Sequence, residues 1–294
     1  KSIITLTLCL GIAVGVNAQL FKNTKESKYQ FKEVVRLDAS PVESQGRTGT
    51  CWSFSALSFL ESEIMRINKL EEPIVLSEMF IVRKAYEAKA EKYIRMDGRT
   101  NFGEGGAFHD IPFVIKNFGI LPRSEYTGKE KKKDVYNHGA MFEKLDSIVQ
   151  KAKAAGKGLQ ADWITAYNDV LDDDMGALPE SFKYKGVEYT PEAFYNSLNI
   201  DMGDYVSLTS FTNHKLHKSC LLQIPDNWLW EESYNVTLDE LFNATLNALK
   251  SGYSVAWGAD VSEKGFSFKN GIAIAPAEDA QIIIEGQDNK NFSD

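Results

Sequence analysis

QGRTGTCWSFSA, residues 45–56, is the stretch around which the rest of this chain is organised. Two glycines precede Cys51, and apolar residues then recur at steps of three and four as far as Ile67, which predicts a helix with one buried face. Cys51 falls in the first turn of that helix, where unpaired backbone N–H groups and the positive end of the helix dipole favour a thiolate. Gln45, six residues upstream, carries an amide that can donate hydrogen bonds. This pairing is suited to stabilising the oxyanion of an acyl-transfer reaction.

The stretch resembles the nucleophile segment of the papain family of cysteine peptidases, which reads Q-G-x-C-G-S-C-W-A-F-S-A. Thr48 stands in place of the first cysteine of that motif, and Thr50 in place of the small residue before the nucleophile. The resemblance implies a papain-like α+β fold, with a helical left domain and an antiparallel β right domain. It also implies that Cys51 is the catalytic nucleophile, that Gln45 stabilises the oxyanion and that Trp52 lies at the substrate site. The alternative is that Cys51 is only a small apolar residue buried at a helix start.

The composition is that of an ordinary globular protein, with 43% hydrophobic and 25% charged residues among 294. The formal net charge of -8 argues against nucleic acid as the main partner, because phosphate recognition needs basic side chains. Beyond residue 18 the chain has two cysteines, Cys51 and Cys220, which make neither a disulfide framework nor a metal site. We expect Cys220 to be buried, and no metal or organic cofactor is implied.

The first 18 residues have the pattern of a signal peptide. A lysine precedes an apolar run over residues 3–16, and Val16-Asn17-Ala18 then offers small residues for cleavage. The run is too short to span a membrane comfortably. We therefore expect an exported protein; lipid attachment at Cys9 is the alternative, although the bulky Leu8 before it argues against this.

The papain-like pattern has a second element further along the chain. Gly105 and Gly106 precede a helix that we expect over residues 108–118. Glycines have no Cβ, so the backbone at this pair can approach an extended substrate as a sheet edge does. In the papain family such a pair binds the substrate backbone. The alternative is a tight loop that serves only as the entry to the helix. Upstream of it, Ser77 is expected to cap another helix.

The expected domain order is a helical papain-like domain over residues 19–127, a helical insertion over 128–203 and the start of a β-rich domain over 204–294. Helices are predicted over 141–155, 161–171 and 191–198, with three aspartates, 172–174, at a solvated helix end. Strands are predicted over 205–209, 221–224 and 253–260. Between them Thr237 begins a capping box that opens a helix reaching Lys250.

A cysteine nucleophile needs an imidazole as general base, and this chain has four histidines. His109 and His138 are expected in solvated positions, whereas His214 and His217, between two strands of the later half, are left as alternative candidates for the base. No histidine and no N-S-W-G follow residue 272, where the papain family carries its base. The sequence therefore predicts a β domain that is incomplete, ending before the strands that carry the histidine and asparagine.

The long helical insertion and Thr48 resemble the bleomycin hydrolase and aminopeptidase C branch of the papain family. That resemblance implies hydrolysis of peptides from the N-terminus and assembly into a homohexamer with active sites facing an interior chamber. Two alternatives remain open. One is a cysteine endopeptidase of the same fold, and the other is a non-catalytic peptide-binding protein on a degenerate peptidase scaffold.

Overall fold

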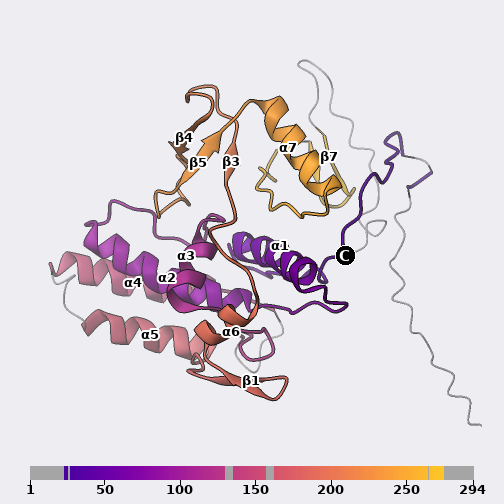
Figure 1. Cartoon of the computed structure of the whole chain (residues 1–294). Helices are drawn as coiled ribbons and strands as arrows, with labels where there is room; N and C mark the ends of the chain where they lie inside the picture. Colours follow the sequence, from indigo (N-terminus) through magenta and orange to yellow (C-terminus); the bar gives the residue numbers. More distant parts are fainter. Residues whose placement is uncertain (1–22, 26, 130–134, 157–161, 264, 275–294) are drawn as a thin grey trace, which may run out of the picture. The chain divides into compact units, whose positions relative to one another are not determined.

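The computed structural model describes residues 23–25, 27–129, 135–156, 162–263 and 265–274 (Figure 1). The predicted signal peptide lies outside these residues. The chain divides into two compact units, one formed by residues 35–258 and the other by residues 1–34 together with 259–294. Within the described ranges, no helix has the length and apolar character that crossing a membrane requires.

Of the three helices near the nucleophile stretch, two begin where local signals predict them, and the third begins two residues later than expected. Helix α1 spans Cys51–Asn68, α2 spans Glu78–Arg95 and α3 spans Asp110–Phe118. The Ser77 hydroxyl accepts a hydrogen bond from the backbone N–H of Phe80 at 3.1 Å, which confirms it as the N-cap of α2. Gly119 ends α3 with a φ of 73°, a conformation that a side chain would strain.

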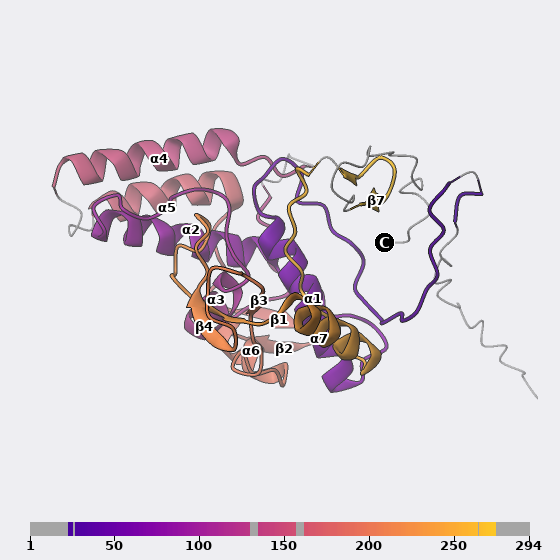
Figure 2. The same cartoon turned by 90° about the horizontal axis from the view of Figure 1, so that it is seen from above.

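Within its described residues, 135–156 and 162–203 together with 128 and 129, the predicted insertion contains three helices and one hairpin. Helices α4, Gly139–Ala154, and α5, Asp162–Met175, lie alongside α2 (Figure 2), and their buried side chains belong to the same core as those of α1, α2 and α3. Packing against α2 therefore makes this segment part of one helical layer. An antiparallel hairpin of β1, Phe182–Tyr184, and β2, Val187–Tyr189, then precedes α6, Pro191–Ser197.

One aspartate of the 172–174 run is not merely solvated. Asp172 pairs with the buried guanidinium of Arg83 at 2.6 Å, which ties α5 to α2. Asp174 lies 3.4 Å from the ammonium of Lys144 on α4. The run lies at the end of α5 with Asp172 and Asp173 exposed, as expected of a solvated helix end, and the neighbouring helices also place cations opposite Asp172 and Asp174.

The sheet of the larger unit is mixed, whereas the sequence predicted an antiparallel one. Its strand order is β3-β5-β4, where β3 is Leu208–Thr209, β4 is Lys218–Leu221 and β5 is Glu232–Asn235. Strand β4 runs antiparallel to β5, but β3 pairs with β5 in parallel. The sequence analysis missed β5 and placed the second strand three residues too late.

The capping box at Thr237 is confirmed, and it opens α7, Leu238–Lys250. The strand predicted over residues 253–260 was wrong, since this segment joins no ladder in the structure. In the smaller unit, β6, Phe266–Ser267, and β7, Ile272–Ala273, form a short antiparallel hairpin.

Candidate active site

Cys51 is the first residue of α1, and its thiol is free and exposed to solvent. The residues on either side of it are buried: Thr50 and Trp52 both lie inside the core. The thiol is therefore held at the start of a buried helix and faces outward, close to the positive end of the helix dipole. Cys220, by contrast, is buried and free, as the sequence predicted.

Gln45 is held by the turn that leads to the nucleophile. Its side-chain Nε2 donates to the carbonyl of Thr48 at 2.6 Å, and the Thr48 hydroxyl donates to the Gln45 carbonyl at 2.8 Å. The hydroxyls of Thr48 and Thr50 are also hydrogen-bonded, at 2.5 Å. A primary amide carries two N–H groups, and the bond to Thr48 engages one of them. The two threonines that depart from the papain motif thus order the turn that carries the glutamine.

Gly46 is required by the same turn. Its φ is 63°, and a Cβ there would lie 2.6 Å from the backbone oxygen of Tyr136. That oxygen accepts the backbone N–H of Arg47 at 2.8 Å, so the turn before Cys51 is anchored on the residues that lead into α4. A side chain at Gly46 would break this contact.

The glycine pair lies against the nucleophile stretch. The indole of Trp52 donates to the backbone oxygen of Glu104 at 3.0 Å, and the Glu104 carboxylate accepts the backbone N–H of Gly49 at 2.7 Å. A Cβ on Gly106 would come within 2.7 Å of the Trp52 ring. The structure therefore brings Gly105, Gly106 and Trp52 together beside the start of α1, and Glu104 links the two loops.

A buried ion pair lies beneath the glycine pair. The ammonium of Lys89, on α2, is 3.8 Å from the Asp110 carboxylate, and their side chains are 1% and 0% exposed. Lys89 also donates to the backbone oxygen of Gly105. The same carboxylate oxygen, Asp110 Oδ2, accepts the indole N–H of Trp228 at 2.7 Å. Lys89 and Asp110 thus join the glycine loop, α2, α3 and the connection between β4 and β5.

Burial shifts both ionisable groups of this pair. It raises the pKa of Asp110 to about 6, against the opposing effect of the Lys89 charge. It lowers the pKa of Lys89, and the charges of Asp110 and Asp226 counteract that effect. Each group therefore depends on the other to remain charged inside the protein.

The sequence analysis did not identify Lys89, Asp110 or Trp228 as part of the site. One signal was present: Lys89 falls four residues after Ala85 and three after Tyr86, both fully buried, so it stands on the apolar face of α2. A lysine at such a position needs a buried partner. The identity of that partner was not readable, because Trp228 lies 118 residues beyond Asp110.

Contrary to expectation, His138 is buried and His109 is half-buried. His138 shares a hydrogen bond of 3.1 Å between its Nδ1 and the hydroxyl of Tyr86. Desolvation lowers the pKa of His138 to about 4, so its imidazole is neutral at pH 7. His109 immediately precedes α3, and burial likewise lowers its pKa.

The other two histidines lie in the connection between β3 and β4. The His217 imidazole is 3.0 Å from the carboxylate of Glu240 in the first turn of α7, and His214 packs edge-on against Phe211. Among the described residues, no hydrogen bond joins Cys51 to any of the four imidazoles. None of them is therefore assigned as the general base.

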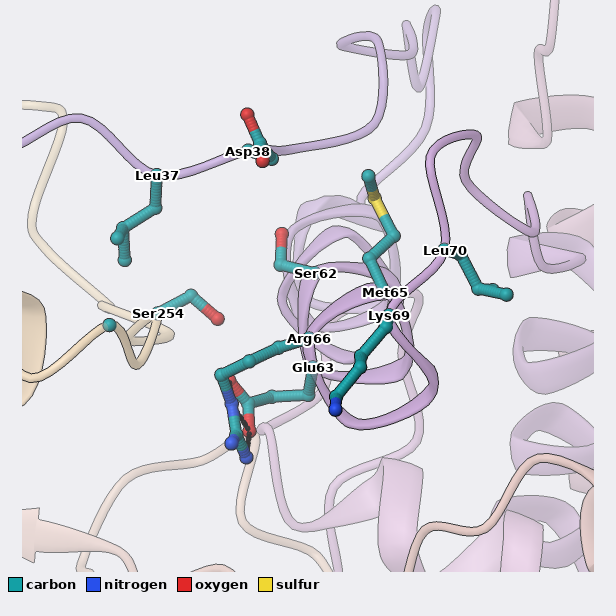
Figure 3. Close-up of a pocket in the computed structure, with 10 residues that line it drawn as sticks. Leu37, Asp38, Ser62, Glu63, Met65, Arg66, Lys69, Leu70 and Ser254 are labelled. Atoms are coloured by element: carbon teal, nitrogen blue, oxygen red, sulfur yellow. Dashed lines mark hydrogen bonds and ion pairs between the residues drawn. The ribbon is translucent and has the colours of Figure 1, made fainter.

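A cavity of about 370 Å³ lies near the opposite end of α1 from Cys51 (Figure 3). Its walls come from α1, from residues 37 and 38 of the lead-in, and from residues 252 and 254 that follow α7. Inside it, Arg66 is already paired with Glu63 at 2.7 Å. The cavity shares no residue with the arrangement around Cys51, so we do not assign it to the candidate active site.

The family model for papain family cysteine proteases matches residues 28–190, which is more than half of the chain. The matched segment contains the nucleophile stretch, the glycine pair, and helices α1 to α5. Among solved structures, the chain is similar to PepW from Lactobacillus rhamnosis, with a TM-score of 0.60 at 18% identity over 74% of this chain and 58% of that one. This likeness shows the fold.

Two peptidases of known name are similar over most of the chain. Aminopeptidase C of Lactobacillus delbrueckii subsp. lactis is 21% identical, covering 79% of this chain and 61% of that protein. Bleomycin hydrolase of Homo sapiens is 23% identical, covering 92% of this chain and 69% of that protein. The chain thus spans about three fifths of the aminopeptidase and about two thirds of the hydrolase.

Proposed function

Because the chain belongs to the papain family of cysteine peptidases, we propose that it is a cysteine aminopeptidase with Cys51 as its nucleophile. One observation carries the proposal: an exposed thiol begins a buried helix, directly beside a glycine pair that packs on the next residue, Trp52. The distant similarity to aminopeptidase C and bleomycin hydrolase supports removal of residues from the peptide N-terminus.

In the proposed reaction the Cys51 thiolate attacks the carbonyl carbon of the scissile peptide bond. The carbonyl oxygen becomes negative, and the second N–H of the Gln45 amide together with the Cys51 backbone N–H stabilises it. The C–N bond then breaks, the amine leaves with a proton, and water hydrolyses the thioester. The backbone of Gly105 and Gly106 would hold the substrate in an extended conformation. The imidazole that carries the protons is not assigned among the described residues.

The test compares Cys51→Ala with Cys220→Ala in the complete protein, using fluorogenic aminoacyl substrates. Cys51→Ala should abolish turnover, whereas removing the buried second thiol should leave activity close to wild type wherever the protein folds. Labelling by the epoxide inhibitor E-64, followed by mass spectrometry, should modify the peptide that contains Cys51. Full turnover by Cys51→Ala would end the proposal.

A non-catalytic peptide-binding protein on the same scaffold is the second candidate, because no described imidazole is hydrogen-bonded to Cys51. It would hydrolyse no peptide and, without an imidazole to activate the thiol, would not be labelled by E-64. An endopeptidase would cleave N-acetylated and free peptides alike, whereas the proposed aminopeptidase rejects the blocked ones. Export and assembly into a hexamer also remain proposals, which cell fractionation and sedimentation of the complete protein would test.

A further inference from the structure

The carboxylate of Asp226 lies directly on Gly105. A Cβ built on Gly105 would be 2.5 Å and 2.6 Å from the two carboxylate oxygens, so any other residue there would force the Asp226 side chain to move. The side-chain amide of Asn101 donates to Asp226 Oδ1 at 3.2 Å. Asp226 is only partly buried, so its charge stands at the surface of the loop that we propose holds the substrate backbone.

The connection between β4 and β5 holds Asp226 in this position. The next residue, Asn227, is buried, and its side-chain amide donates to the backbone oxygens of Leu222 and Glu231, each at 2.8 Å. Trp228 then donates to the buried Asp110 beneath the glycine loop. The carboxylate therefore stands on a turn that is fixed on both sides, so binding a ligand there requires little reordering.

The charges around the loop leave its open side negative. Lys89 faces two carboxylates, those of Asp110 and Asp226, so one negative charge is not neutralised. Lys89 and Asp110 are fully buried, and Asp226 is the member of the three that reaches solvent. A ligand approaching Gly105 from solvent consequently meets a carboxylate, while the lysine lies underneath the backbone.

We propose that Asp226 is a specificity-determining residue that binds a positively charged group on the N-terminal side of the peptide. This inference rests on the proposed function, since it takes the glycine pair as the substrate edge. An ammonium or guanidinium group next to Gly105 would form a charge-assisted hydrogen bond with the carboxylate. The group is either the α-ammonium of the peptide or the side chain of a lysine or arginine.

The test uses aminoacyl chloromethyl ketones, which alkylate a thiol as the C–Cl bond breaks and an S–C bond forms. The phenylalanine ketone with a free amine is compared with its N-acetyl form, and the lysine ketone with the norleucine ketone, both with free amines. The rate of Cys51 modification is measured by mass spectrometry at pH 6.5, where an α-amine with a usual pKa near 8 is protonated. In the wild-type full chain, the more positively charged probe of at least one pair should react about tenfold faster than the other.

Asp226→Asn should bring the ratio of the two modification rates close to one, and Asp226→Glu should retain part of the preference. Glu232→Gln, which removes an exposed carboxylate on β5, is the matched control and should leave the ratio unchanged. The wild-type ratio should also fall as NaCl is raised from 0.05 to 1 M, which needs no variant. The free-amine pair and the lysine pair show which cation is bound. Modification of Cys51 without charge preference, or a preference that survives in Asp226→Asn, would overturn this inference. No modification of Cys51 by any probe would instead overturn the proposed function.

Discussion

Glu61 is a buried carboxyl whose replacement should make the protein more stable at alkaline pH. It lies on α1 with 4% of its surface exposed, accepts the backbone N–H of Leu76 at 2.7 Å and accepts the Ser40 hydroxyl. Burial raises the pKa of Glu61 from 4.5 to about 7, and the two hydrogen bonds oppose that effect only in part. The replacement is Glu61→Gln, which keeps an acceptor for Leu76 and a polar group for Ser40.

The sign follows from proton binding. The folded state holds the Glu61 proton more tightly than the unfolded state, so this group stabilises the fold below pH 4.5, and the contribution is lost as the pH rises through about 7. The difference between the two pKa values, 4.5 and about 7, is worth roughly 1.36 kcal/mol for each unit. Ionisation of Glu61 therefore lowers the free energy of unfolding by about 3 kcal/mol at pH 8. At pH 5 the same relation gives a loss of only about 1 kcal/mol in the free energy of unfolding.

The assay is urea unfolding followed by tryptophan fluorescence at pH 5 and pH 8. Relative to wild type, Glu61→Gln should gain about 2 kcal/mol more at pH 8 than at pH 5. Glu63→Gln is the matched control two residues along α1, because Glu63 is just as buried but pairs with Arg66 at 2.7 Å. It should lose stability at pH 8. An equal effect of Glu61→Gln at both pH values would refute the reasoning.

Two predictions concern the site itself. Gln45→Ala should lower kcat on the order of 10²-fold with KM little changed, because an oxyanion donor acts in the transition state. Steady-state assays test this, and a change confined to KM would contradict it. Lys89→Met should cost about 3–5 kcal/mol in urea unfolding, because it leaves Asp110 buried without its cation. Adding Asp110→Asn should recover most of that loss, because the amide oxygen still accepts the indole N–H of Trp228. A double variant that is no more stable than Lys89→Met would argue against the pairing.

Local signals in the sequence were sufficient for several helices. The start of α1 at Cys51, the Ser77 cap of α2 and the Thr237 capping box of α7 all agree with the structure. Each depends on residues within one turn of the helix end, where the free backbone N–H groups need partners close by in the chain. The papain motif around Cys51 is similarly short, and the family match agrees with it.

The sheet was harder to predict from the sequence than the helices, because its strands come from distant segments of the chain. Strand β3 pairs with β5 across more than twenty residues, and nothing near either strand specifies that it runs parallel. The prediction that His138 is solvated was wrong for a related reason. Its burial is produced by the packing of α4 against α2, where it meets the hydroxyl of Tyr86.

Short-range patterns along the chain were enough to identify the papain family, the helix on which Cys51 stands and the glycine pair that follows it, because these depend on near neighbours. The tertiary structure alone decided that Lys89 and Asp110 lie under that pair and that Asp226 lies on it. A buried ion pair survives only where folding brings its two charges together and removes water from both. No spacing within a single segment can specify that outcome.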